Sequence, residues 1–146
     1  MKKIFFLITA VFTFQVIIAQ QKTTGGSIIV QLNGIKEQSG QVLLSLFNSE
    51  EGFPTQPEKA FRWSKAKVTS SSLIISLDGL PLGTYAIAVV QDENFNNAMD
   101  RNWYGMPDEP YGISNNATGS FAPPKFEEAK FTVTGKRDTI RIEMQP

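Results

Sequence analysis

Hydrophobic and polar positions alternate in short segments along most of the chain. In the segment "TIRIEM" near the C-terminus, Ile140, Ile142 and Met144 alternate with charged residues, which predicts a strand with one buried face. Six further segments between turn residues are rich in branched and aromatic side chains: 27–33, 41–47, 65–70, 73–77, 84–90 and 129–134. The residues "GKRD" before the last strand predict a hairpin loop. No stretch of a dozen residues has a sustained helical period, although a short helical turn is expected within 57–63.

About seven short strands in a chain of this size favour an all-β fold, an antiparallel β-sandwich, over a barrel. Within "DGLPLGTYAIAV", Pro81 and Gly83 form a turn. Tyr85, Ile87 and Val89 then share one face of the following strand. This segment is similar to the Leu-Pro-x-Gly-x-Tyr corner of bacterial immunoglobulin-like and transthyretin-like modules, so a sandwich of either type is the expected fold.

Residues 1–19 have the pattern of a secretory signal peptide. Lys2 and Lys3 precede the apolar run "IFFLITAVFTFQVIIA", and the small residue Ala19 is followed by polar residues. The run is shorter than the about 20 apolar residues of a membrane span, and polar residues interrupt it. The chain has no cysteine, which excludes a lipid-anchored cysteine and a disulfide framework. We therefore expect cleavage after Ala19, export to the periplasm or the extracellular space, and no transmembrane segment after cleavage.

Removing residues 1–19 from a chain of 146 residues leaves enough for one domain with a single core. We expect residues 20–26 to be a flexible N-terminus and residues 27–146 to be a single β-sandwich domain. The whole chain has 14 basic and 14 acidic residues, and the signal peptide contains two of the basic ones. The exported part is therefore slightly acidic and has no basic stripe, which argues against nucleic acid as a partner.

A long loop, residues 91–125, separates the strand that ends at Val90 from the C-terminal strands. It contains four prolines and three glycines but almost no aliphatic residues. Loops longer than about 15 residues are uncommon in compact domains and are usually functional or disordered. This loop also carries many large aromatic and Met side chains, which disordered segments lack. We therefore expect it to fold onto the sandwich.

The stretch "DENFNNAMD" within this loop places oxygen-bearing residues at alternate positions. The residues that match positions 1, 3, 5, 7 and 9 of a calcium loop are Asp92, Asn94, Asn96, Ala98 (through its carbonyl) and Asp100. A hard cation requires several oxygens from one tight bend, and Glu109 or Asp108 is expected to fold back and complete the shell. Calcium is therefore the candidate cofactor, with the affinity of extracellular modules, about 10⁻⁴ to 10⁻³ M.

A metal-free bend is the alternative interpretation of the same residues. Asn and Asp cap turns and tolerate positive φ without any cation. Trp103 stands at position 12 in place of the bidentate glutamate, and Asn97 stands at position 6, where glycine is usual. The spacing alone leaves both interpretations open.

The segment "YAIAVVQDENFNNAMDRNWYGMPDEPYGISNN" resembles the signature of the bacterial family catalogued as domain of unknown function 2141, whose members are small exported proteins. The residues that match the family pattern are Asp92, Glu93, Asn94, Asn96, Asp100, Gly105, Pro107, Glu109, Tyr111, Gly112, Ser114 and Asn115. Phe95 and Asn97 stand where the pattern favours glycine, and Gln91 stands where it often has histidine. The resemblance implies an exported sandwich and no known activity.

The absence of His and Cys excludes a Ser-His or Cys-His nucleophile and a typical zinc site. Loop carboxylates leave one enzymatic alternative, a carbohydrate-active protein that uses acid and base groups chosen from Asp92, Asp100, Asp108 and Glu109. Metal ligation or solvent-exposed polarity explains these acids with fewer assumptions. The sequence therefore favours a protein that is not an enzyme.

Loop aromatics are the candidate ligand-binding residues. Trp103, Tyr104 and Tyr111 could stack on a sugar or fill a pocket of a partner. The alternative is a small satellite core that attaches the loop to the sandwich. Trp63 and Phe61 are expected to be packing residues. Together these features predict a non-catalytic binding or envelope-structural module whose partner is an unknown protein or a glycan.

Overall fold

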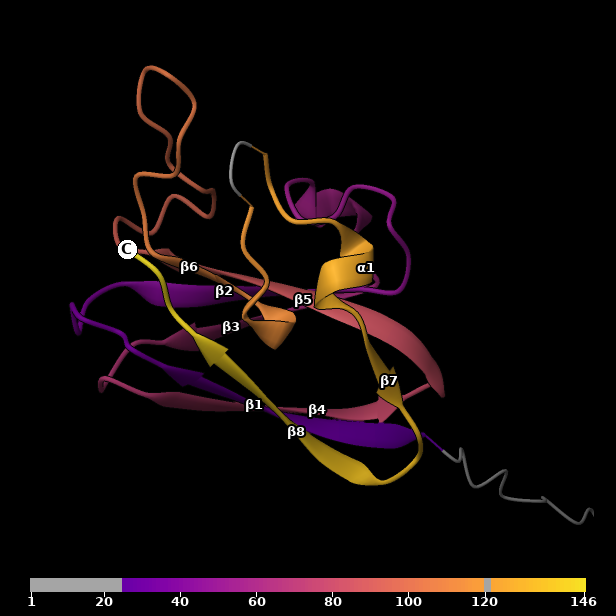
Figure 1. Cartoon of the computed structure of the whole chain (residues 1–146). Coiled ribbons are helices and arrows are strands. Elements are labelled where there is room, and N and C mark those ends of the chain that lie inside the picture. The colour runs from indigo at the N-terminus through magenta and orange to yellow at the C-terminus, as the bar shows by residue number, and fades with distance from the viewer. Residues whose placement is uncertain (1–24, 120–121) are drawn as a thin grey trace, which may run out of the picture.

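Two β-sheets lie face to face in the computed structural model, which describes residues 25–119 and 122–146 (Figure 1). The strands are β1 (Gly26–Asn33), β2 (Gln41–Phe47), β3 (Arg62–Lys67), β4 (Leu73–Leu80), β5 (Gly83–Asp92), β6 (Tyr111–Ile113), β7 (Phe131–Val133) and β8 (Arg137–Glu143). The short helices are η1 (Pro57–Lys59), η2 (Ser114–Asn116) and α1 (Phe126–Ala129). One sheet has the order β4-β1-β8, and the other has the order β3-β2-β5-β6, with β7 pairing with β5.

The predicted all-β antiparallel sandwich is confirmed, although the pairing of β1 with β8 is parallel. Every predicted strand segment overlaps an observed strand, and the expected helical turn within 57–63 is η1. The additional strand is β6, which lies inside the segment predicted as a loop. Because only three of its residues pair with β5, it is too short to show a recognisable alternation.

The predicted hairpin between the last two strands is wrong. β7 pairs with β5 in the larger sheet, whereas β8 pairs with β1 in the smaller one. The chain crosses between the sheets near Gly135, whose φ of 88° is available to glycine at no steric cost. The same glycine-containing turn that suggested a hairpin therefore carries the chain from one layer of the sandwich to the other.

Strand β5 lies at the centre of the molecule because both of its faces are covered. Its inward residues Ile87 and Val89 pack in the core between the two sheets. Its outward residues Ala86 and Ala88 belong to a second cluster, with Phe47, Ile113, Phe126 and Ala129. The second cluster attaches α1 and the neighbouring loops to the outer face of the larger sheet (Figure 1).

The predicted corner before β5 is present and is held by a side-chain hydrogen bond. The Tyr85 hydroxyl donates to the Pro81 carbonyl at 2.9 Å. Tyr85, Ile87 and Val89 are all buried, as their shared face predicts. A tyrosine that bonds back to the backbone a few residues upstream is a feature of immunoglobulin-like sandwiches.

The predicted signal peptide, residues 1–19, lies outside the described residues, as do residues 20–24. Gly26 is buried in β1, and a Cβ there would lie 2.2 Å from Val133 Cγ1. Gly26, which the sequence assigned to a flexible N-terminus, is therefore the first residue of β1. Among the residues that the structure describes, no helix has the length and apolar character of a membrane span.

The predicted long loop, 91–125, is divided by regular structure. Its first two residues end β5, and β6 and η2 occupy 111–116. The remaining parts are two excursions, 93–110 and 117–125. Figure 1 shows that the described parts of both excursions rise from the outer face of the larger sheet, together with the segment 48–61.

Candidate binding groove and its supporting loop

The first excursion begins with a carboxylate that closes a tight bend. Asp92 is the last residue of β5 and is fully buried. Its Oδ1 accepts the backbone N–H of Asn96 at 3.0 Å, and its Oδ2 accepts that of Asn97 at 2.8 Å. The carboxylate accepts a third hydrogen bond from the Gln41 side chain on β2, which donates to Oδ2 at 2.7 Å. One carboxylate thus joins the bend to two strands of the sheet.

The charge of Asp92 is stabilised by these contacts. Burial removes water from the carboxyl group and by itself would raise its pKa. Hydrogen bonds from the Gln41 amide and from the backbone N–H groups of Asn97 and Asn96 outweigh burial, so the pKa of Asp92 lies below its ordinary value. The side chain is therefore ionised at neutral pH, which suits an acceptor of several hydrogen bonds.

The Asn-rich bend is a chain of side-chain-to-backbone hydrogen bonds. Asn94 Oδ1 accepts the N–H of Asn96 at 2.9 Å, and Asn96 Oδ1 accepts the N–H of Ala98 at 2.8 Å. The amide nitrogens of Asn94 and Asn96 donate to the two oxygens of Asp100, at 2.5 and 2.9 Å. Every side chain of this set therefore contributes to the bend itself.

Two residues of the bend have positive φ. Phe95 and Asn97 both have a φ of 63°, a conformation that favours glycine. These are the two positions at which the family pattern has glycine. The chain therefore carries side chains at two positions of positive φ, and Phe95 is 55% exposed.

A second buried carboxylate closes the base of the excursion. Glu109 is buried, and its two oxygens accept the backbone N–H groups of Glu93 and Asp100, each at 3.0 Å. The N–H of Asp108 donates to the Asp100 carbonyl at 2.9 Å. Because Glu93 and Asp100 lie at the two ends of the Asn-rich bend, Glu109 ties both ends of the bend to the base of the excursion.

The tip of the excursion, residues 101–107, is a small turn of its own. Asn102 N–H donates to the Met106 carbonyl, and Met106 N–H donates to Asn102 Oδ1, both at 3.0 Å. Gly105 has a φ of 85°, and its carbonyl accepts a bond from Arg101 at 2.9 Å. The apolar residues that this tip exposes are Trp103, Tyr104 and Met106.

A groove of about 790 Å³ lies on the outer face of the larger sheet, between the excursions. Leu43, Ser45, Ala88 and Val90 are the outward-facing residues of β2 and β5 that line it. Ser45 and Ala88 face each other in the register of these strands, and their small side chains leave space above the sheet. The lining also includes Trp63, Lys65, Asn97, Tyr104, Met106 and Tyr111.

The structure separates the predicted ligand-binding residues. Tyr104 and Tyr111 line the groove, but Trp103 does not and is 92% exposed beside Tyr104. The satellite core suggested as an alternative contains only Tyr111 of these three residues, because Trp103 and Tyr104 are exposed. The residues predicted to form the site are thus divided between the groove and the solvent.

The prediction that Trp63 is a packing residue is wrong. Trp63 lies on β3, lines the groove and is 67% exposed. The alternation within "RWSKAK" places it on the same exposed face as Lys65 and Lys67, which is the sequence signal that could have revealed it. Phe61 is also exposed, although its ring lies 5.8 Å from that of Tyr85.

The calcium interpretation remains a prediction. No group of three or more acidic, His or Cys side chains converges on a metal position in the described ranges 25–119 and 122–146. Both oxygens of Glu109 are occupied by backbone N–H groups. Asp92 Oδ1 and Asn94 Oδ1 do lie close together, because both accept the N–H of Asn96. A cation would need Asp100 to exchange its amide hydrogen bonds for the metal.

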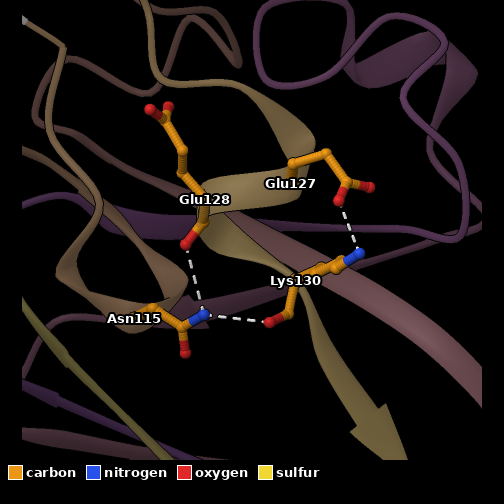
Figure 2. A network of polar contacts seen from close by, with 4 residues as sticks. All are labelled: Asn115, Glu127, Glu128 and Lys130. Carbon is orange, nitrogen blue, oxygen red and sulfur yellow. Dashed lines mark hydrogen bonds and ion pairs between the residues drawn. The ribbon is translucent and has the colours of Figure 1, made fainter.

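The Tyr-Gly-x-Ser-Asn part of the family pattern joins separate elements of the fold. The buried Ser114 hydroxyl donates to the Ala129 carbonyl at 2.6 Å and accepts the Ile87 N–H at 2.9 Å. The Asn115 amide, at a φ of 59°, donates to the carbonyls of Glu128 and Lys130 (Figure 2). These residues therefore hold η2 against β5 and α1, a role that their spacing in the sequence did not reveal.

The protein is thus a small two-sheet β-sandwich with a groove on the outer face of its larger sheet. The chain belongs to the bacterial family described as "Uncharacterized protein conserved in bacteria (DUF2141)", whose model matches residues 30–141. The resemblance noted in the sequence is thereby confirmed. No curated protein sequence matches the chain.

Two solved structures of one protein, the pilus-presented adhesin Spy0125 (Cpa), are similar to the chain. The first has 12% sequence identity and a TM-score of 0.35, and it matches 84% of this chain and 27% of its own length. The second has 12% identity and a TM-score of 0.28, and it matches 84% of this chain and 28% of its own length. The chain thus corresponds to little more than a quarter of the adhesin.

We predict that Glu109→Gln lowers the free energy of unfolding by about 1–3 kcal/mol. The amide nitrogen of Gln would face one of the two backbone N–H groups that Glu109 now accepts, leaving a partly buried donor without a partner. Urea unfolding measures the change. The matched control is Asp108→Asn, since Asp108 is the exposed neighbouring acid and should change stability by less than about 0.5 kcal/mol. Equal effects of the two substitutions would contradict the role of Glu109.

We predict that the effect of Asp92→Asn depends on pH. Because the pKa of folded Asp92 is lowered from 3.8, its ionised form stabilises the fold above that value and loses this contribution as pH falls through the folded pKa. At pH 7 the variant should be less stable by about 1–3 kcal/mol. Unfolding curves measured from pH 7 down to pH 2 should stay apart from those of the wild type near neutral pH and converge with them only as pH falls below 3.8. A difference that stays constant over this range would contradict the assignment.

Proposed function

We propose that the chain is an exported, non-catalytic binding module of the bacterial cell envelope, and that the groove on the larger sheet is its binding site. The observation that carries the proposal is the exposure of large apolar side chains around an open hollow. Trp63 is 67% exposed, Tyr104 62% and Met106 58%. Isolated exposed apolar residues are ordinary, but residues of this size gathered around one hollow are typical of a recognition surface.

The composition of the groove supports recognition of a partner or a glycan. Apart from Ser45 its floor is apolar, whereas Lys65, Asn97 and Arg101 add polar and charged groups to its lining. A mostly apolar hollow with a few polar groups is the usual form of a ligand site. Trp and Tyr also supply large contact areas at low entropic cost, which makes them frequent contributors of binding energy.

The state of the loop carboxylates supports a non-catalytic role. A glycoside hydrolase needs one carboxyl group with a raised pKa to act as the acid. Asp92 has a lowered pKa, and its oxygens are held by the bend. Glu109 is likewise occupied by two backbone N–H groups. These two acids therefore act on the loop, and the hydrolase remains the less favoured alternative.

Export is part of the proposal because of the N-terminal sequence. Residues 1–19 combine two lysines, an apolar run and a small residue at the expected cleavage site. The absence of cysteine leaves a chain whose fold needs no disulfide in an oxidising compartment. The periplasm and the cell exterior both suit such a module.

We further propose that calcium tightens the excursion that forms one wall of the groove. The supporting observation is that Asp92 Oδ1 and Asn94 Oδ1 both accept the Asn96 N–H and so lie close together in one tight bend, as the oxygens of a calcium loop must. Asp100 would supply the second carboxylate after releasing the amide groups that it now accepts. With only two carboxylates, the site would be weak.

The groove predicts which tryptophan senses the ligand. The chain has two tryptophans, so Trp103→Phe leaves Trp63 as the only one, and Trp63→Phe leaves Trp103. We expect a ligand found on arrays of envelope glycans and extended peptides to change the emission of Trp63 and not that of Trp103. Trp63→Ala should weaken binding at least about tenfold, the loss typical of a truncated binding residue.

Both tryptophans are exposed, so neither substitution should unfold the protein, which circular dichroism will check. The opposite ranking, in which Trp103→Ala abolishes binding and Trp63→Ala does not, would contradict the groove as the site. If none of the ligands on the arrays changes the emission of Trp63, the proposed binding function is wrong.

The calcium proposal predicts a rise in melting temperature. If the dissociation constant is about 10⁻⁴ M, 10 mM calcium stabilises the fold by about 2.7 kcal/mol, a shift on the order of ten degrees. Differential scanning calorimetry with calcium and with chelator measures it, and Asp100→Asn should abolish the shift. Equal melting temperatures with calcium and with chelator would leave only the metal-free bend.

A further inference from the structure

Strand β3 is the edge strand of the larger sheet. Among the described residues, 25–119 and 122–146, it pairs with β2 alone, which leaves one side of its backbone open. The N–H of Val68 donates to the Gly40 carbonyl at 3.2 Å, and antiparallel pairs bond at alternate residues. This alternation assigns the backbone groups of Ala66 and Ser64 to β2. It leaves the N–H and carbonyl groups of Trp63, Lys65 and Lys67 on the open edge.

The three residues with free backbone groups are also those with exposed side chains. The burial pattern of β3 alternates, and Trp63, Lys65 and Lys67 are its exposed members. The Lys65 ammonium lies 5.7 Å from the centre of the Trp63 ring. Within the described residues neither Lys65 nor Lys67 forms an ion pair, and β3 contains no acid. The Lys65 ammonium donates to Asn97 Oδ1 at 2.5 Å, which brings no negative charge. The edge therefore presents two positive charges without an acidic partner among the described residues, next to an exposed indole.

We propose that this edge binds an acidic, extended polypeptide, which adds a strand to the larger sheet beside β3. The proposal rests on the proposed binding function and names the partner class for the same face, since Trp63 and Lys65 also line the groove. Main-chain hydrogen bonds to β3 supply affinity, and alternate side chains of the added strand supply specificity. Acidic residues at every second position would face Lys65 and Lys67, and a branched apolar residue would face Trp63.

The charges favour a different molecule over a second copy of this chain. Antiparallel pairing of β3 with another β3 would place two strands that carry only positive charge beside each other, and facing like charges destabilise such a pair. Lysines on an edge strand can also act only to prevent aggregation. If the lysines served only to prevent aggregation, an exposed tryptophan on the same strand would work against them, because Trp63 adds apolar surface to the edge.

The test uses the exported chain, residues 20–146, and two fluorescein-labelled seven-residue peptides with blocked ends. The acidic peptide has glutamate at its second and fourth positions, valine at its sixth and threonine elsewhere. The basic peptide replaces both glutamates with lysine. Fluorescence polarisation should show binding of the acidic peptide at least about tenfold tighter than that of the basic one. In the double variant Lys65→Glu/Lys67→Glu the preference should reverse.

A second variant separates strand addition from simple charge attraction. Lys65→Pro removes an N–H that faces solvent, which an edge strand tolerates, and circular dichroism will confirm that it folds. Lys65→Gln removes the same charge and keeps the N–H. We expect the proline variant to bind the acidic peptide at least about fivefold more weakly than the glutamine variant, since one main-chain bond is lost. Equal binding by the two variants would overturn strand addition.

Failure of this inference and failure of the proposed function give different results. Binding of a glycan or a neutral peptide that depends on Tyr104, without preference for the acidic peptide, would overturn the inference and leave the binding function intact. If neither peptide binds and Lys65→Thr/Lys67→Thr self-associates, the lysines only prevent aggregation. If no ligand of any class changes Trp63 emission, both proposals fail.

Discussion

Two buried carboxylates hold the outer part of this molecule together. Asp92 and Glu109 accept backbone N–H groups from four different residues of one excursion, at 2.8–3.0 Å. A buried charge is costly unless hydrogen bonds compensate it, and charge-assisted bonds to the backbone are among the stronger ones available. The excursion is therefore fixed by contacts at its base, and its tip is left free to present side chains. Tyr104 and Met106 form part of the groove wall only because that base is closed.

Much of the sandwich could be predicted from the sequence because its strands follow simple alternation. The signal is clear where one face is buried, as around Ile142 in β8. It fails where pairing is decided over long distances. β7 and β8 are adjacent in sequence but belong to different sheets, a choice made by the partners β5 and β1. The three residues of β6 likewise form a strand only because β5 is available beside them.

The candidate site is harder to predict because the type of a residue does not reveal where its side chain points. The Asp and Asn residues of the bend suggest ligands, but their side chains bond to the bend that carries them. Trp103 and Tyr104 are neighbours of the same chemical kind, yet only Tyr104 lines the groove. Trp63 is far from both in sequence and reaches the groove through the register of β3 on β2. Most residues of the family pattern therefore support the loop, while Trp63 and Tyr104, which lie outside the pattern, line the groove.

Amide hydrogen exchange of the wild-type chain tests most directly whether the excursion is one ordered unit. The amides of Glu93, Asn96, Asn97 and Asp100 donate to the two buried carboxylates. Although their side chains are largely in contact with water, these amides should exchange at least about a hundredfold more slowly than in an unstructured peptide. The amide of the exposed tip residue Trp103 should exchange much faster. Unprotected exchange from residue 93 to residue 110 would contradict the account of the loop and of the groove that it supports.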